Sequence, residues 1–218
     1  HSHQSSFVPL FLNHPQIQIV AVADEADIDA DIIAANEAGA RQLGVPYVVG
    51  INSAFERADV DIVSVGCEIE RRSDIAVRAA RAGKHLWIDK FLGASLAEGD
   101  AVVRAVEAAG VAAIVPSYAY GELVTQSRNV IDSGTIGELL GLHIDIMFGK
   151  GMPRPVAPET RLPFLPPGRW KFPDVKRELL TIGAYAVGLI QSCCAEIVEV
   201  CGHGGAHFFP EQAAHGTE

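Results

Sequence analysis

The feature that most constrains the fold is a strand followed by a helix, a unit that occurs three times in the first half of the chain. The β-branched, apolar segments typical of buried strands are residues 17–24, 61–66, 85–88 and 111–115. Alanine-rich helical sequence follows the first three of them and ends at Gly44, Gly83 and Gly110. Strands that alternate with helices of this length predict right-handed βαβ crossovers. We therefore expect an α/β fold with a doubly wound parallel sheet, covered by helices on both faces.

Two local signals bear on where this fold begins and how its helices start. Ser95 with Glu98 three residues later forms a capping-box pattern, which predicts a helix start. A doubly wound nucleotide-binding sheet normally opens with a strand and a glycine-rich turn that holds the pyrophosphate. Here FVPLFLNH, residues 7–14, reads instead as the first helix. We expect the first strand to lie before His1, and the protein to continue beyond Glu218.

The alternation of strands and helices stops after Pro116, which indicates a second domain. Beyond it we expect a helix at 121–133, a half-exposed strand at 139–148, an irregular proline-rich segment at 151–174 and a helix from 178 to about 194. The predicted domains are a dinucleotide-binding, Rossmann-like domain over 1–116, lacking its first strand, and a partial α+β domain over 117–218.

Composition excludes several classes of protein. The chain has 17 Lys+Arg against 27 Asp+Glu and a net charge of −10, which argues against nucleic acid as a partner. It has no uncharged apolar run of roughly 18 residues and no signal peptide, so we expect a cytoplasmic protein that does not span a membrane.

The cysteine and histidine patterns predict neither disulfides nor a metal site. The four cysteines lack CxxC spacing and the density of a disulfide-stapled secreted domain, so we expect reduced thiols. His203 and His207 are the only two histidines at helical spacing, but glycines surround them. We therefore predict no metal ligands.

Asp24 is the first candidate for cofactor binding, because it ends the strand 17–24. A carboxylate at this position can accept hydrogen bonds from both hydroxyls of an adenosine ribose and repels a 2′-phosphate. This favours NAD over NADP. The alternative is that Asp24 only starts a turn or caps the helix that follows, and the sequence leaves both readings open.

The dipeptide Asp89-Lys90 follows a strand directly, at the edge of the sheet where cofactors bind. A lysine there can orient a substrate hydroxyl and lower its pKa through positive charge. The alternative is a solvated ion pair.

Further along the chain, Thr181 and Tyr185 are four residues apart, so on a helix they share one face. Tyr185 could pass a proton in a cleft, or could be a core tyrosine with a satisfied hydroxyl.

Taken together, three segments resemble the Gfo/Idh/MocA oxidoreductase family. They are GKHLWIDK, DSGTIGELLGLHI and TIGAYAVGL, which correspond in order to the family's GKHVxxEKP motif, SGxIGxI/L segment and DxGxHxxD helix. The resemblance implies a nicotinamide-binding domain followed by an α+β domain that covers the substrate and forms homo-oligomers. It assigns Lys90 to substrate and cofactor contact, and it places His3, Asp24, Gly66, Cys67 and Asp89 at the cofactor.

The chain departs from these motifs at several positions. Asp89 and Phe91 replace the Glu and Pro of EKP, and Arg72 stands where many members have a histidine. In the helix motif Thr181, Tyr185 and Gly188 replace Asp, His and Asp. Branches similar to glucose-fructose oxidoreductase and dihydrodiol dehydrogenase have a tyrosine at the histidine position, so Tyr185 can take over proton transfer.

The resemblance implies an NAD(P)-dependent oxidoreductase that moves hydride between nicotinamide and a sugar, cyclitol or similar polyol. Lys90 and Tyr185 would be catalytic, Thr181 would contact the substrate beside them, and NAD would be the preferred cofactor. The alternative is a nucleotide-sensing regulator or scaffold that keeps the fold without catalysis.

Overall fold

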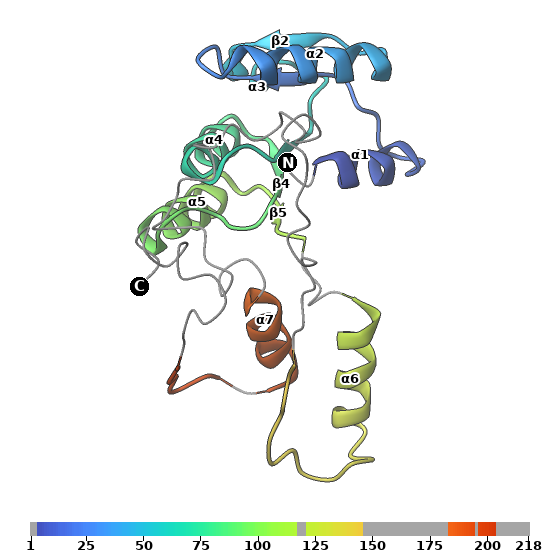
Figure 1. The fold of residues 1–218 in the computed structure, drawn as a ribbon, viewed down its shortest axis with the longest axis vertical. Coiled ribbons are helices and arrows are strands. Elements are labelled where there is room, and N and C mark those ends of the chain that lie inside the picture. The colour runs from blue at the N-terminus through green and yellow to red at the C-terminus, as the bar shows by residue number, and fades with distance from the viewer. Residues whose placement is uncertain (1–3, 117–120, 146–182, 195, 204–218) are drawn as a thin grey trace, which may run out of the picture. The chain divides into compact units, whose positions relative to one another are not determined.

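The computed structural model describes residues 4–116, 121–145, 183–194 and 196–203 of the chain (Figure 1). The chain divides into two compact units, His1–Pro116 and Ser117–Glu218. The division falls where the strand and helix pattern stops in the sequence. That the two units are a cofactor domain and a substrate domain stays a prediction.

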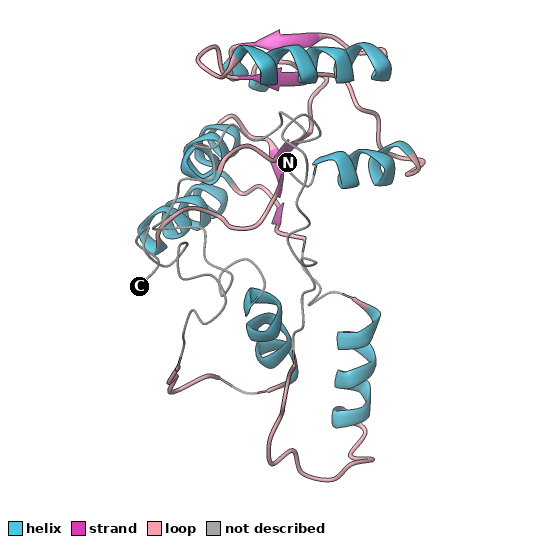
Figure 2. Cartoon of the chain, viewed as in Figure 1, coloured by secondary structure: helices cyan, strands magenta, loops and turns pink. Residues whose placement is uncertain are grey.

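Within each sheet of the first unit the paired strands run parallel, as the sequence predicts (Figure 2). They are β1 (Val22–Asp24), β2 (Tyr47–Val49), β3 (Ile62–Val65), β4 (His85–Ile88) and β5 (Ala113–Ile114). β1 pairs with β2, while β3, β4 and β5 form a second sheet in that order. The predicted doubly wound α/β class is confirmed, although most strands are shorter than the apolar runs that predicted them.

Within the described residues β1 and β3 are not paired with each other. In doubly wound sheets the strand that comes first in the chain lies between the second and the fourth. The pairing of β1, β2 and β3 is that of a second, third and fourth strand.

Helices connect and cover these strands. In the first unit they are α1 (Gln4–Leu12), α2 (Ala30–Leu43), α3 (Ile51–Phe55), α4 (Ile69–Arg81) and α5 (Leu96–Ala109), and in the second α6 (Glu122–Asp132) and α7 (Ala184–Cys193). The predicted stops at Gly44 and Gly110 are left-handed C-caps, with φ of 68° and 64°. Only glycine adopts this conformation without strain, so these positions end their helices.

Side chains of β4 point alternately to two helical layers. Leu86 and Ile88 are buried, and they belong to one core cluster with residues of α4 and α5, which lie side by side (Figure 1). Trp87 faces the other way, where Phe7 and Phe11 of α1 meet it edge-on at ring distances of 5.5 and 5.3 Å. The sheet is thus covered on both faces.

Some expectations are corrected. β2 and α3 were not anticipated, because their apolar runs are too short to show a period. The strand predicted at 139–148 is wrong where it can be judged, since 139–145 contains no strand and Leu140 is 90% exposed. A strand needs a hydrogen-bonded neighbour, and no strand of the second unit among the described residues pairs with it. The irregular segment at 151–174 and residues 178–182 of the predicted last helix lie outside the described residues.

Candidate cofactor site

Asp24 is the last residue of β1, and its carboxylate is held by two neutral donors. Asn36 of α2 donates from Nδ2 to Oδ2 at 2.8 Å, and Tyr47 of β2 donates from Oη to the same oxygen at 2.9 Å. Asp24 Oδ1 receives no hydrogen bond from the described residues. One carboxylate oxygen is therefore fixed by the protein, and the other remains available to a ligand. The carboxylate accepts bonds from α2 and β2, and its role in binding a cofactor stays a prediction.

The cations near this end of β1 are paired with other carboxylates. Arg71 forms a bidentate pair with Asp27 at 2.5 and 3.0 Å, and Arg78 pairs with Glu25. In the part of the chain that the structure describes, no lysine or arginine forms an ion pair with Asp24. None of the described cations thus neutralises its negative charge.

The pKa of the Asp24 carboxyl reflects this environment. Burial raises the pKa above its ordinary value of 3.8, the bonds from Asn36 and Tyr47 oppose that rise, and the charge of Glu68 adds to it. Burial and the bond to Asp24 raise the pKa of Tyr47, so its phenol stays protonated and remains a donor.

Gly66 and Cys67 follow β3 at the same edge of the sheet. A Cβ on Gly66 would collide with the side chain of Gln4, the first residue of α1, so this glycine allows α1 to approach the end of β3. Burial raises the pKa of the Cys67 thiol to about 12. Cys67 is therefore a neutral group near pH 7 and not a nucleophile.

Asp89 and Lys90 follow β4. The alternative of a solvated ion pair is wrong, because Asp89 is only 3% exposed. Asp89 Oδ1 accepts the backbone N–H of Lys90 at 2.9 Å, and Asp89 Oδ2 lies 3.9 Å from Nη2 of the buried Arg72. The Lys90 ammonium lies 5.9 Å from the centre of the Phe91 ring. Asp89 thus holds the turn that carries Lys90.

The remaining predicted residues are not brought into this group. His3 and Thr181 lie outside the described residues. Tyr185 is half-buried on α7 in the second unit, whereas Lys90 is in the first. A site shared by Lys90 and Tyr185 stays a prediction.

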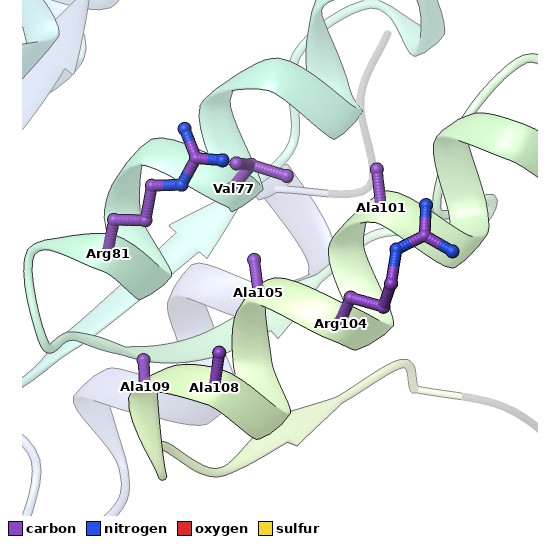
Figure 3. A pocket seen from close by; sticks show the side chains of 7 residues that line it. All are labelled: Val77, Arg81, Ala101, Arg104, Ala105, Ala108 and Ala109. Atoms are coloured by element: carbon purple, nitrogen blue, oxygen red, sulfur yellow. The ribbon is translucent and has the colours of Figure 1, made fainter.

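An open groove between α4 and α5 is separate from these residues. Figure 3 shows Arg81 of α4 and Arg104 of α5 beside alanine side chains that line it, among them Ala105. None of the predicted site residues lines the groove. Across the described ranges we find no cluster of three potential metal ligands, and no helix there is long and apolar enough to cross a membrane.

Sequence reasoning missed the two donors to Asp24. Tyr47 belongs to the strand that was not anticipated. Asn36 carried a usable signal, because asparagine is unfavourable inside a helix unless its side chain has a partner. Arg72 was noted only as a departure from a family motif, and nothing in the sequence showed that it is buried.

Comparison with known families decides how this site is interpreted. The sequence model of the oxidoreductase family with an NAD-binding Rossmann fold matches residues 3–117, which is more than half of the chain. The chain belongs to the Gfo/Idh/MocA oxidoreductase family. The predicted family is confirmed. Of the three motifs, only GKHLWIDK lies within the matched residues, which carry the NAD-binding Rossmann fold of the family.

Individual Gfo/Idh/MocA relatives are more distant. The chain is 29% identical to dTDP-3,4-didehydro-2,6-dideoxy-alpha-D-glucose 3-reductase of Streptomyces violaceoruber over 62% of its own length and 38% of that protein. It is also 29% identical to inositol 2-dehydrogenase of Salmonella paratyphi B over 48% of its length and 30% of that enzyme. The chain therefore matches only about a third of the length of these relatives.

A solved structure agrees on the fold. The WlbA dehydrogenase of Bordetella pertussis, crystallised with NADH and UDP-GlcNAcA, superposes with a TM-score of 0.54 at 18% identity. The match covers 62% of this chain and 38% of that one. At this identity the likeness concerns the fold alone, and it supports the α/β assignment.

Proposed function

We propose that this protein is an NAD-dependent oxidoreductase that transfers hydride between nicotinamide and a carbinol carbon of a sugar or cyclitol. Family membership supports the reaction class, and the named relatives, a sugar reductase and an inositol dehydrogenase, support the substrate class. Both names describe enzymes, which favours catalysis over the regulator interpretation.

The observation that carries the preference for NAD is the carboxylate of Asp24. Its oxygen Oδ1 accepts no bond from the described residues, and no described lysine or arginine pairs with it. Such a group suits the two hydroxyls of an adenosine ribose and repels a 2′-phosphate. Glu68 adds negative charge nearby, as its effect on the pKa of Asp24 indicates.

The residues that would hold the cofactor fit its chemistry. Asp24 accepts from the adenosine ribose, and Gly66 lets the chain pass close to α1 at the end of β3. Lys90 leaves the end of β4 on a turn fixed by Asp89. When bound, the nicotinamide supplies the site that accepts or donates hydride.

The protein groups would handle the oxygen and its proton. The ammonium of Lys90 polarises the substrate oxygen and stabilises negative charge on it. As a phenolate, Tyr185 accepts the hydroxyl proton when the alcohol is oxidised, and as the resulting phenol it returns the proton when the ketone is reduced, so the proton and hydride balance in both directions. Thr181 is proposed to hold a neighbouring substrate hydroxyl.

Turnover tests this proposal. The full chain is incubated with NAD⁺ and a panel that includes myo-inositol, hexoses and nucleotide sugars, and NADH is followed by absorbance. We expect turnover with at least one of these substrates. Lys90→Met and Tyr185→Phe should each lower kcat/KM by roughly 100-fold or more, the usual scale for loss of an acid-base or electrostatic group.

Arg81→Lys is the matched control, since Arg81 is an exposed cation in the groove between α4 and α5 and keeps its charge in the variant. Its activity should equal that of the parent. If Lys90→Met and Tyr185→Phe each leave turnover within about threefold of the parent, the assigned roles are wrong. Cofactor binding without turnover over the whole panel would contradict the proposed activity.

A further inference from the structure

Arg72 of α4 is a buried cation that the proposed reaction does not use. The residue is 6% exposed and is one of six buried residues of α4. Its guanidinium donates from Nη2 to the carbonyl of Cys67 at 2.7 Å and from Nη1 to the carbonyl of Phe91 at 3.1 Å. Nη2 also lies 3.9 Å from Asp89 Oδ2. Burying the charge of Arg72 costs free energy, so we ask what its contacts do for the protein.

These contacts join two turns at one edge of the sheet. β3 and β4 are parallel neighbours with Val65 opposite Ile88, so the turns that follow them leave from the same edge. Cys67 lies on the first turn and Asp89 and Phe91 lie on the second. One guanidinium therefore ties the turn after β3 to the turn after β4.

The contacts on the second turn fall on both sides of Lys90. Asp89 precedes it and Phe91 follows it, and Arg72 contacts each of them. Asp89 also accepts the backbone N–H of Lys90 through Oδ1. The backbone on either side of Lys90 is thus held by the same buried cation.

We propose that Arg72 is a positioning residue, which fixes the turn after β4 so that Lys90 is presented at the carboxyl edge of the sheet. This inference rests on the proposed function for its catalytic meaning, but the contact geometry carries it. A planar guanidinium has several donors in fixed directions and can serve three acceptors at once. The single ammonium of a lysine lacks that geometry.

Charge supports this geometry. Burial lowers the pKa of the Arg72 guanidinium, and the charge of Asp89 opposes that shift. Arginine keeps its proton even in such surroundings, so the link between the two turns stays charged near neutral pH. Nε of Arg72 makes no hydrogen bond to the described residues, so the contacts to the two turns come from Nη1 and Nη2.

The first test follows backbone amides and needs no turnover. Labelling with ¹⁵N-lysine gives one amide signal for each of five lysines, which are Lys84, Lys90, Lys150, Lys171 and Lys176. The signal of Lys90 is assigned by its loss in Lys90→Arg. Spectra are then recorded for Arg72→Met and for Arg72→Met/Asp89→Asn, in which both buried charges are removed together so that no unpaired carboxylate remains.

We expect the Lys90 amide signal to shift and to exchange with solvent faster than in the parent in both variants, while the Lys84 signal stays unchanged. Lys84 is the internal control, because its ammonium is held by the carbonyls of Arg57 and Val60 at the start of the same strand. General loosening of the domain would move the Lys84 signal as well. An unchanged Lys90 signal, or equal shifts at Lys84 and Lys90, would overturn the inference.

The second test is a kinetic cycle between Arg72→Lys and Lys90→Met. Misplacing a catalytic group by about 1 Å can cost up to 100-fold, so Arg72→Lys should lower kcat roughly 10- to 100-fold while the KM for NAD⁺ changes little. In the Lys90→Met background the same change should cost less than about threefold, because the positioned group is gone. Equal losses in both backgrounds would show a merely structural role and overturn the inference. A full chain without any turnover contradicts the proposed function instead, while the amide test still decides the role of Arg72.

Discussion

At the scale of single residues, Asp24 shows how a predicted site residue acquires its properties from neighbours the sequence did not reveal. The sequence placed an acid at the end of a strand and left two readings open. Asn36 and Tyr47 both donate to one oxygen of the carboxylate, and the role of Asp24 in cofactor binding stays a prediction. These donors come from elements well separated along the chain, so their meeting depends on the pairing of β1 with β2.

The two donors should therefore contribute to cofactor preference. Tyr47→Phe removes one neutral bond to Asp24 Oδ2, so the carboxylate is less well oriented and its neutral form is favoured. We expect the ratio of the Kd for NADPH to the Kd for NADH to fall roughly 3- to 10-fold, as the loss of about one hydrogen bond implies. Titration by nicotinamide fluorescence measures both constants.

The control for this measurement is Asn52→Ala. A Tyr→Phe control at Tyr118 or Tyr120 is not used, because these residues lie outside the described residues. Asn52 is exposed on α3 and accepts from Arg78, away from the Asp24 carboxylate. The ratio of the two Kd values in Asn52→Ala should equal the ratio in the parent. A Tyr47→Phe ratio equal to that of the parent would show that the phenol does not influence cofactor choice.

The raised pKa of Asp24 predicts a stability cost with a definite sign. The folded chain holds the Asp24 proton more tightly than the unfolded chain, so stability falls as pH rises from the ordinary pKa of 3.8 through the raised value. Asp24→Asn removes this cost while keeping an acceptor for Asn36 and Tyr47. We expect the Tm of Asp24→Asn to exceed that of the parent near neutral pH, with the difference shrinking toward the acid end of the range. Thermal unfolding at several pH values measures it, and a Tm below that of the parent at neutral pH would contradict the argument.

At the scale of elements, helix ends were the part of the fold most accessible from the sequence. Ser95 accepts the backbone N–H of Glu98 at 3.3 Å, as the capping box predicts. The return bond differs, because Glu98 accepts the N–H of Ala94 and not that of Ser95. The residue types predict the cap of α5, but which backbone N–H donates to Glu98 depends on the path of the chain into the helix.

Removing this cap gives a stability prediction. Ser95→Ala should lower the free energy of unfolding by about 1 kcal/mol, since an N–H at the start of α5 loses its side-chain acceptor. Ser53→Ala is the control, because Ser53 is exposed within α3, whose N-cap is Gly50. Urea unfolding compares the two. Equal stability of the two variants would mean that the Ser95 hydroxyl does not cap α5 in solution.

Strands were harder to predict than helices. The run at 85–88 became β4 with the same bounds, because its side chains pack against α4 and α5 on one face and α1 on the other. The run at 139–148 had a similar alternation but no neighbouring strand among the described residues, and 139–145 contains no strand. Alternation reports which side chains can be buried, whereas a strand also requires a partner that the local sequence does not contain.

At the scale of the whole molecule, the sequence was sufficient for the family and for the class of fold. Three motifs in a fixed order carried the resemblance, and the family match over residues 3–117 confirms it. The hydrogen bonds to Asp24 and the contacts of Arg72 around Lys90 could not be predicted, because they join segments that are distant in sequence. The chain matches about a third of the length of its named relatives, so substrate and activity are proposals for the whole protein.

The most direct test of the account is a titration of the full chain with NADH and with NADPH, following nicotinamide fluorescence. The un-neutralised Asp24 carboxylate predicts that NADH binds at least about 10-fold more tightly, and that Asp24→Asn narrows this difference by weakening NADH and improving NADPH. Equal affinities in the parent, or a preference for NADPH, would contradict the role given to Asp24. Failure to bind either cofactor would contradict the proposed function itself.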